Sequence, residues 1–165
     1  MSSPQHSTLR KPGIAFLLAQ IGAHAAELFA EKLKPLKLVP AEAGILRILA
    51  ASEGISQQAL AQMLGMYPSR LVAVIDAMER SKLVERRIGV GDRRIFEIHL
   101  TSRGKEKLGA VSRVAHEHKE LICRSLTASE QETLAELLAK IAEDRKLVAG
   151  VHPGYRRLRN RKDGS

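Results

Sequence analysis

Apolar residues recur every three or four positions along most of the chain, which is the spacing of amphipathic helices. From Ile14 to Phe29 this pattern predicts a first helix, which ends near Pro35. Pro40 fits the first turn of a second, shorter helix that stops around Gly54. Two helices are therefore expected in the first third of the chain.

Two further helices are expected on either side of Gly65. Ser56 has the side chain of an N-cap for the third helix, in which we expect Leu60 and Met63 to be buried. The fourth helix opens at residues 67–69 and leaves its first turn exposed. Its inward face is expected to consist of Leu71, Val72, Val74, Ile75 and Met78.

The hydrophobic period shortens toward 2 after Leu83, which is typical of β-strands. A strand over 84–88, a tight turn over 89–92 and a return strand over 94–100 make the expected hairpin. One face of the return strand is expected to pack on the helices through Phe96, Ile98 and Leu100.

Two long helices follow the hairpin. Thr101 is the expected cap of a fifth helix, and Thr127 with Glu130 makes a capping box that opens a sixth, whose apolar stripe we expect to include Val148. Together with the first helix, these have more apolar surface than a small helix-and-hairpin unit covers. We therefore expect pairing with a second copy, which makes the protein a homodimer.

The composition is that of one ordinary globular domain: 165 residues, 44% hydrophobic and 27% charged. The longest uninterrupted apolar run, Ile14 to Ala19, is too short for a bilayer span or most signal peptides, so we expect no membrane segment and a cytoplasmic location. Cys123 is the single cysteine, which excludes an intrachain disulfide and a thiolate-rich zinc site within one chain.

The charge balance favours a polyanionic partner. Lys and Arg number 27 against 18 Asp and Glu, a formal net charge of +9. Residues 67–104 hold 8 basic and 5 acidic side chains, and residues 150–165 hold 5 and 1, so the excess is concentrated in these two segments. Aromatic residues make up only 3%, which disfavours a surface that stacks unpaired bases. Duplex DNA is therefore the favoured partner.

The order helix, short turn, helix, basic hairpin is that of a winged helix-turn-helix, in which the second helix of the pair enters the major groove. The expected fold class is mainly α with a small β-hairpin wing. We divide the chain into a flexible arm (1–12), dimerisation helices (13–35 and 102–149), a winged helix-turn-helix DNA-binding region (36–101) and a basic flexible tail (150–165).

From about residue 13 to residue 148 the sequence resembles the MarR family, the multiple-antibiotic-resistance-type transcriptional regulators. The segments that carry the resemblance are SQQALAQMLGMYPSRLVAVIDAMERSKLVERR at 56–87, GDRRIFEIHLTSRG at 91–104 and LTASEQETLAELLAKI at 126–141. The wing followed by LTSRG is the most specific of these. Lys82 stands where the family usually has glycine, so it must take the left-handed conformation or the helix must end differently.

The resemblance implies a DNA site on the third and fourth helices and the wing. In the family's pattern the wing aspartate, here Asp92, braces an arginine, and an arginine of the pair Arg93 and Arg94 reaches into the minor groove. Arg70 is the expected reader of a guanine edge. The other expected DNA contacts come from Ser56, Gln57, Tyr67, Pro68, Ser69, Arg86 and Arg87.

The family often binds small aromatic or lipophilic anions between its dimer helices and its DNA-binding unit. No residue pattern here identifies an effector, so its binding residues stay unassigned. His24, on the apolar side of the first helix, is interpreted as a core or interface histidine and not as an effector ligand.

The remaining candidate chemistry is weak. Gly89 and Gly91 form a lone Gly-x-Gly, which does not indicate a dinucleotide site. His116 and His118 are two residues apart, whereas zinc-binding pairs on a helix favour four, so we interpret them as surface residues. We expect no enzymatic activity, no cofactor and no metal.

The sequence thus predicts a regulator that binds a pseudo-palindromic duplex site as a dimer, most often a repressor relieved by a small molecule. Two alternatives remain open: a dimeric helical scaffold that binds RNA or an acidic protein, and a redox-sensing regulator based on Cys123. The hairpin arginines are also compatible with a solvated surface bearing ion pairs to Glu85, Asp92 and Glu97.

Overall fold

The computed structural model describes residues 12–89, 95–148 and 150–151. Its helices and strands are α1 (Ile14–Leu33), the 3-10 turn η1 (Lys34–Leu36), α2 (Pro40–Ala51), β1 (Ile55–Ser56), α3 (Gln57–Leu64), α4 (Pro68–Arg80), β2 (Val84–Ile88), β3 (Phe96–Leu100), α5 (Ser102–Cys123) and α6 (Ala128–Asp144). The expected arm up to residue 11, the wing tip at 90–94 and the expected tail from 152 onward lie outside the described residues.

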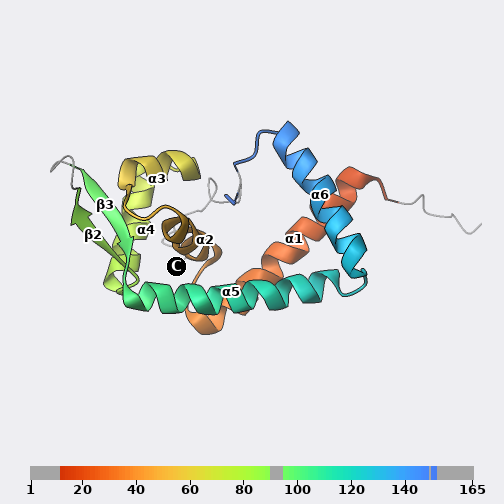
Figure 1. The fold of residues 1–165 in the computed structure, drawn as a ribbon, viewed down its shortest axis with the longest axis horizontal. Helices are drawn as coiled ribbons and strands as arrows, with labels where there is room; N and C mark the ends of the chain where they lie inside the picture. Colours follow the sequence, from red (N-terminus) through yellow and green to blue (C-terminus); the bar gives the residue numbers. More distant parts are fainter. Residues whose placement is uncertain (1–11, 90–94, 149, 152–165) are drawn as a thin grey trace, which may run out of the picture.

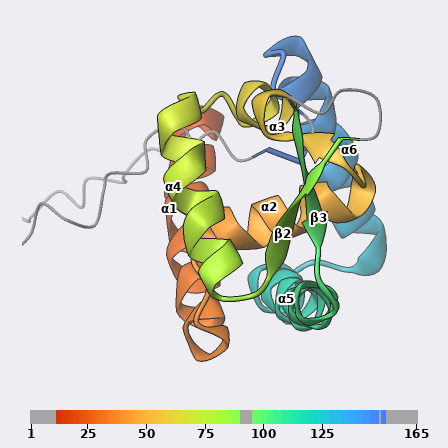
Figure 2. The same cartoon turned by 90° about the vertical axis from the view of Figure 1, so that its left-hand side faces the viewer.

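The elements gather at the two ends of α5. Figure 1 shows α2, α3, α4 and the strands at the end where α5 begins, and α6 with the first half of α1 at the other end. Figure 2 looks along α5 and shows α3, α4 and the strands together on the near side. This arrangement separates a small helix-and-sheet unit from the helices expected to dimerise.

The sheet has three antiparallel strands in the order β1-β3-β2. The hairpin was expected, and its register pairs Val84 with Leu100 and Ile88 with Phe96. The third strand, β1, was not predicted, and it pairs Ile55 with Ile98. A strand of two residues is too short to produce a hydrophobic alternation in the sequence.

The core lies between α2, α3, α4 and the sheet, and its side chains include Leu46, Leu60, Leu71, Ile75 and Ile98, each at most 1% exposed. The expectation that Met63 and Val72 are buried is wrong, because they are 36% and 37% exposed. Consecutive helical residues point about 100° apart. Once Leu60, Leu64 and Leu71 face the core, Met63 and Val72 are turned toward its edge.

Thr101 and Gly104 of the LTSRG motif join α5 to the end of α4. The Thr101 hydroxyl accepts from the Gly104 backbone N–H at 3.0 Å and donates to the Lys82 carbonyl at 2.6 Å. Its backbone N–H donates to the Leu83 carbonyl at 3.2 Å. A Cβ atom on Gly104 would lie 2.0 Å from the same Leu83 carbonyl oxygen, so only glycine allows this approach.

Helix α4 ends by the first of the two expected alternatives, with Lys82 in the left-handed region at φ 57°. The Lys82 backbone N–H donates to the Glu79 carbonyl at 2.8 Å, and that of Leu83 donates to the Met78 carbonyl at 2.9 Å. These two bonds make a Schellman motif, whose left-handed position is normally glycine. Lysine holds that position here against the steric cost of its Cβ.

Helix α6 begins as predicted and ends earlier. Thr127 and Glu130 form the capping box, and hydrogen bonds from the Thr127 backbone and hydroxyl hold the pKa of the Glu130 carboxyl below its usual value. The helix stops at Asp144, because Lys146 takes φ 52° and closes a second Schellman motif. Val148, which was expected to extend the apolar stripe of this helix, therefore lies beyond its end.

Helix α1 with η1, Ile14–Leu36, is long and apolar enough to cross a membrane by length and composition, which the short uninterrupted apolar run did not predict. Signal sequences and core helices of soluble proteins meet the same criterion. Here the second half of α1 contacts α5. His118 Nε2 donates to the Ala25 carbonyl at 2.9 Å, and Lys32 pairs with Glu117 at 3.3 Å. These bonds hold α1 within the protein fold.

We expect Gly104→Ala to destabilise the fold by about 1–3 kcal/mol, because the added Cβ must displace the Leu83 carbonyl. Urea unfolding at one fixed protein concentration measures the change. Gly109→Ala is the matched control on the same helix, since nothing described lies within 4 Å of its added Cβ. A loss of stability that is equal in both variants would contradict the close-approach argument.

We expect Lys82→Gly to raise the free energy of unfolding by about 0.5–1 kcal/mol, because glycine removes the Cβ strain at φ 57°. Lys82→Ala removes the charge and keeps the Cβ, so it serves as the control and should bring no such gain. Thermal and urea unfolding of the two variants check the difference, and a gain shared by alanine would assign the effect to charge.

Candidate nucleic-acid interface

The helix pair α3 and α4 is built from local signals that the sequence displays. The Ser56 hydroxyl accepts from the Ala59 backbone N–H at 3.1 Å and caps α3, which ends at Gly65 in the left-handed conformation. Tyr67 is the N-cap of α4, and Pro68 occupies its first position. A two-residue link therefore separates Gly65 from α4, as a helix-turn-helix requires.

The first turn of α4 projects from the surface. Tyr67 is 82% exposed, Pro68 and Ser69 are exposed, and Arg70 is half-buried with a contact inside the chain. From Leu71 onward the buried face of α4 anchors the helix in the core. The predicted reading residues thus stand together at the start of a helix whose remaining turns are fixed by packing.

Arg86, which was expected to lie near phosphates, is the centre of an internal ion-pair network. Its guanidinium donates to Asp76 and Glu79 of α4, each at 2.5 Å, and its Nε donates to the Gln57 side chain at 3.2 Å. Only 20% of the Arg86 side chain is exposed. This one guanidinium joins β2 to both helices of the pair, and it uses the Gln57 side chain that was also expected to contact the DNA backbone.

The described part of the wing carries an exposed ion pair and an apolar pair. Arg87 is 58% exposed and donates to Glu85 on its own strand at 2.5 and 2.8 Å. Ile88 and Phe96 pair across the strands and are exposed. Phe96 was expected to pack on the helices, and this expectation is wrong, because the residue is 52% exposed. Asp92, Arg93 and Arg94 lie outside the described residues.

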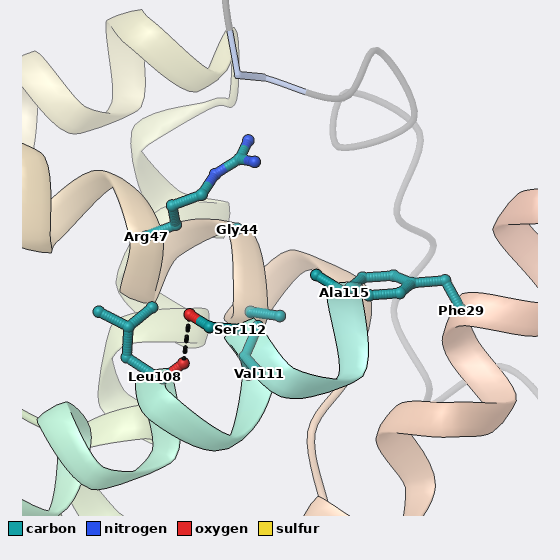
Figure 3. A pocket seen from close by; sticks show the side chains of 8 residues that line it. Phe29, Gly44, Arg47, Leu108, Val111, Ser112 and Ala115 are labelled. Carbon is teal, nitrogen blue, oxygen red and sulfur yellow. Dashed lines mark hydrogen bonds between the residues drawn. The ribbon is translucent and has the colours of Figure 1, made fainter. Parts of the chain in front are cut away.

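A pocket of about 130 Å³ lies between α1, α2 and α5 (Figure 3). Arg47 is the one charged side chain among its described lining residues, and the rest of the lining is mostly apolar. The lining consists of Phe29, Ala43, Gly44, Arg47, Leu108, Val111, Ser112 and Ala115. Sequence reasoning missed this pocket because three distant helices form it, and no spacing within one segment marks it.

The histidines and the cysteine that the sequence analysis considered differ in burial and in their neighbours. His116 is exposed beside Glu120, whereas His118 packs edge-on against Phe29, so the surface interpretation holds for His116 only. His24 is exposed in the single chain, which excludes a core position. Cys123 is half-buried at the end of α5. Within the described residues no three His, Cys, Asp or Glu side chains gather as metal ligands.

Three comparisons place this geometry among known proteins. The HTH-type transcriptional repressor Rv2887 of Mycobacterium tuberculosis is 28% identical over 131 residues, which cover 79% of this chain and 94% of that protein. The transcriptional repressor CouR, solved bound to a 23-mer DNA duplex, is 28% identical with a TM-score of 0.71 over 79% of this chain and 92% of its own. Wild-type MarR from E. coli, at 22% identity, shares the fold with a TM-score of 0.71 over 81% of this chain and 98% of its own.

The family model of the MarR family matches residues 38–96, which run from the start of α2 into β3. This segment contains the helix pair, the Arg86 network and the wing. The relatives and the shared fold extend the match to the long helices on either side. The comparisons therefore show a MarR-family domain at residues 38–96, within a chain whose fold is similar to that of MarR from E. coli.

Proposed function

We propose that this protein is a dimeric, sequence-specific DNA-binding transcriptional regulator that acts as a repressor. The observation that carries the proposal is the exposed first turn of α4, held on a packed helix pair beside a two-stranded wing. The same fold in CouR is seen bound to a DNA duplex, and Rv2887 is a repressor. A helix of this kind fits the major groove, where base edges are distinguishable.

The proposed DNA contacts fall into three groups. Arg70 reads a guanine edge, with Tyr67, Pro68 and Ser69 beside it at the start of α4. Ser56, at the N-terminus of α3, positions the phosphate backbone. Arg87 contacts phosphate on the wing, while Asp92, Arg93 and Arg94 act in the minor groove.

Arg86 and Gln57 have a positioning role in this proposal. Their side chains bind each other and the carboxylates of α4. Because the network spans β2, α3 and α4, it fixes the angle between the reading helix and the wing. Both must fit one duplex at the same time, so the network contributes to DNA binding without contacting the DNA.

A second copy of the chain covers the apolar faces that the single chain leaves exposed. The first half of α1 and one face of α6 carry these side chains, and Figure 1 shows both elements at the same end of the molecule. They are Ile14, Phe16, Leu17, Leu18, Ile21, Leu134, Leu137, Leu138 and Ile141. Members of the family are dimers. A two-fold dimer presents two α4 helices to half-sites about one helical turn apart.

The pocket at Arg47 is the proposed effector site. A small aromatic or lipophilic anion fits its chemistry, since the walls are mostly apolar and one cation lies at the rim. The family's regulators are soluble DNA-binding proteins. With duplex DNA as its partner, the protein is assigned to the cytoplasm.

We expect Arg70→Ala to weaken specific binding by about 1–3 kcal/mol and to relax the preference at one base position. Arg94→Ala should weaken native and scrambled duplexes alike and lower the salt slope by about one. Anisotropy with duplex from the protein's own upstream region, competed with scrambled duplex at two salt concentrations, measures both changes.

Lys119→Ala is the matched control for these variants, because Lys119 is exposed on the half of α5 that lies toward α6. It should leave both the affinity and the slope unchanged. Equal, salt-sensitive binding of native and scrambled duplex by the unmodified protein would reject sequence-specific regulation. Preference for structured RNA would favour the scaffold alternative.

We expect Leu137→Glu to weaken dimerisation by at least about 100-fold, since two buried leucines are lost per dimer and two carboxylates enter an apolar interface. Sedimentation analysis should show the mass falling toward the 18.1 kDa of one chain. Lys140→Glu introduces the same carboxylate outside the apolar face of α6, with a charge change of −2 in place of −1, and should remain dimeric. An unchanged mass for Leu137→Glu would place the dimer interface elsewhere.

A further inference from the structure

The chain that follows α6 returns to the pocket between α1, α2 and α5. Arg47 Nη2 donates to the Gly150 carbonyl at 2.5 Å, joining α2 to a residue 103 positions further along the chain. In Figure 3 the guanidinium of Arg47 points away from Leu108 and toward the returning blue segment. The one cation of the pocket lining is therefore bound to the protein's own backbone.

This contact is built into the fold of the returning segment. The Schellman motif at Lys146 reverses the chain after α6. The Val151 backbone N–H donates to the Val148 carbonyl at 3.1 Å, and the Val151 side chain packs against the core. Residues 150 and 151, which were assigned to a flexible tail, are thus held against the DNA-binding unit.

Gly150 is suited to this position for two reasons. Its φ of +74° lies in the left-handed region, which side chains disfavour. A Cβ atom at Gly150 would also lie 3.1 Å from Arg47 Nη2, closer than an ordinary contact. A side chain at residue 150 is therefore strained at this φ, and its Cβ shifts the Arg47 guanidinium by a few tenths of an ångström.

The Gly150 carbonyl is a weaker partner for a guanidinium than a carboxylate is. A carboxylate accepts two parallel hydrogen bonds from arginine and carries the opposite charge. An anion whose apolar body lies against Phe29 and Val111 would place its charge near Arg47. In Figure 3 the guanidinium points away from Leu108, so it turns toward the pocket to pair with such a carboxylate, and this turn draws Nη2 from the Gly150 carbonyl.

We propose that the segment around Gly150 is an internal competitor for Arg47, so that an aromatic or lipophilic carboxylate binds the pocket only as the bond between Arg47 and Gly150 opens. The inference rests on the proposed effector site and adds its regulation. A competing internal state lowers the apparent affinity by the fraction of molecules that remain closed. Weakening the internal bond therefore tightens ligand binding, which is the reverse of what loss of a binding residue does.

The test uses benzoate as the probe and the full chain, with affinity measured by calorimetry. Gly150→Ala should bind benzoate about tenfold more tightly than the unmodified protein, because its Cβ disturbs the bond to Arg47. Val151→Asp, which places a charge where Val151 packs on the core, should act in the same direction. Arg47→Leu should abolish benzoate binding both alone and combined with Gly150→Ala. Neutral benzamide should have the same affinity for the unmodified protein and for Gly150→Ala.

Gly109→Ala is the control, because an added Cβ there meets nothing described within 4 Å, and its benzoate affinity should equal that of the unmodified protein. Hydrogen exchange of the peptide spanning 147–151 should accelerate when benzoate is added. Unchanged or weaker benzoate binding by both Gly150→Ala and Val151→Asp, or its absence from every variant, would overturn the inference. DNA affinity without benzoate is measured alongside, so a regulator that binds DNA but fails these tests leaves the proposed DNA-binding function intact.

Discussion

The position of the DNA-binding unit on the dimer helices depends on the junction between the start of α5 and the end of α4. Thr101 and Gly104 bring the backbone of α5 onto the Leu83 carbonyl, at a distance that admits no side chain on Gly104. Leu83 in turn directly follows the left-handed Lys82 that ends α4. A displacement of α5 is therefore carried through backbone to the reading helix, with no flexible side chain between them to absorb it.

The Arg86 network supplies the second constraint, within the unit that the junction carries. A guanidinium with two carboxylates and one amide around it has a defined orientation, because each donor has its own acceptor. Loss of Arg86 would leave Asp76 and Glu79 as unpaired neighbours of like charge. The ion pairs of Arg86 with Asp76 and Glu79 are partly exposed, so solvent screens their contribution to stability. Their main effect is to hold β2 against α3 and α4.

The elements that sequence reasoning placed correctly are those with local signals, such as the caps at Ser56, Thr101 and Thr127, which need no distant partner. The left-handed turn at Lys82 was likewise readable from one departure from the family's pattern. The features it misjudged depend on contacts across the fold. The inward face of a helix is set by what packs on it, and the end of α6 is fixed by a backbone turn, which accounts for the errors at Met63, Val72, Phe96 and Val148. The internal partners of Arg86 come from other elements, so the sequence alone does not indicate them.

The pocket between α1, α2 and α5 depends on contacts across the fold, whereas the α3–α4 helix pair has local sequence signals. The two are nevertheless connected through α5. Leu108 lines the pocket one helical turn after Gly104, so the pocket wall and the junction belong to the same stretch of α5. Arg47 lies on the opposite wall, on α2, which packs within the DNA-binding unit. At the proposed effector site, a ligand between these walls would act on the spacing of α2 and α5 close to the point where the unit is attached. Such a ligand would change DNA affinity only by binding one spacing better than the other, and in the structure described here Gly150 holds Arg47.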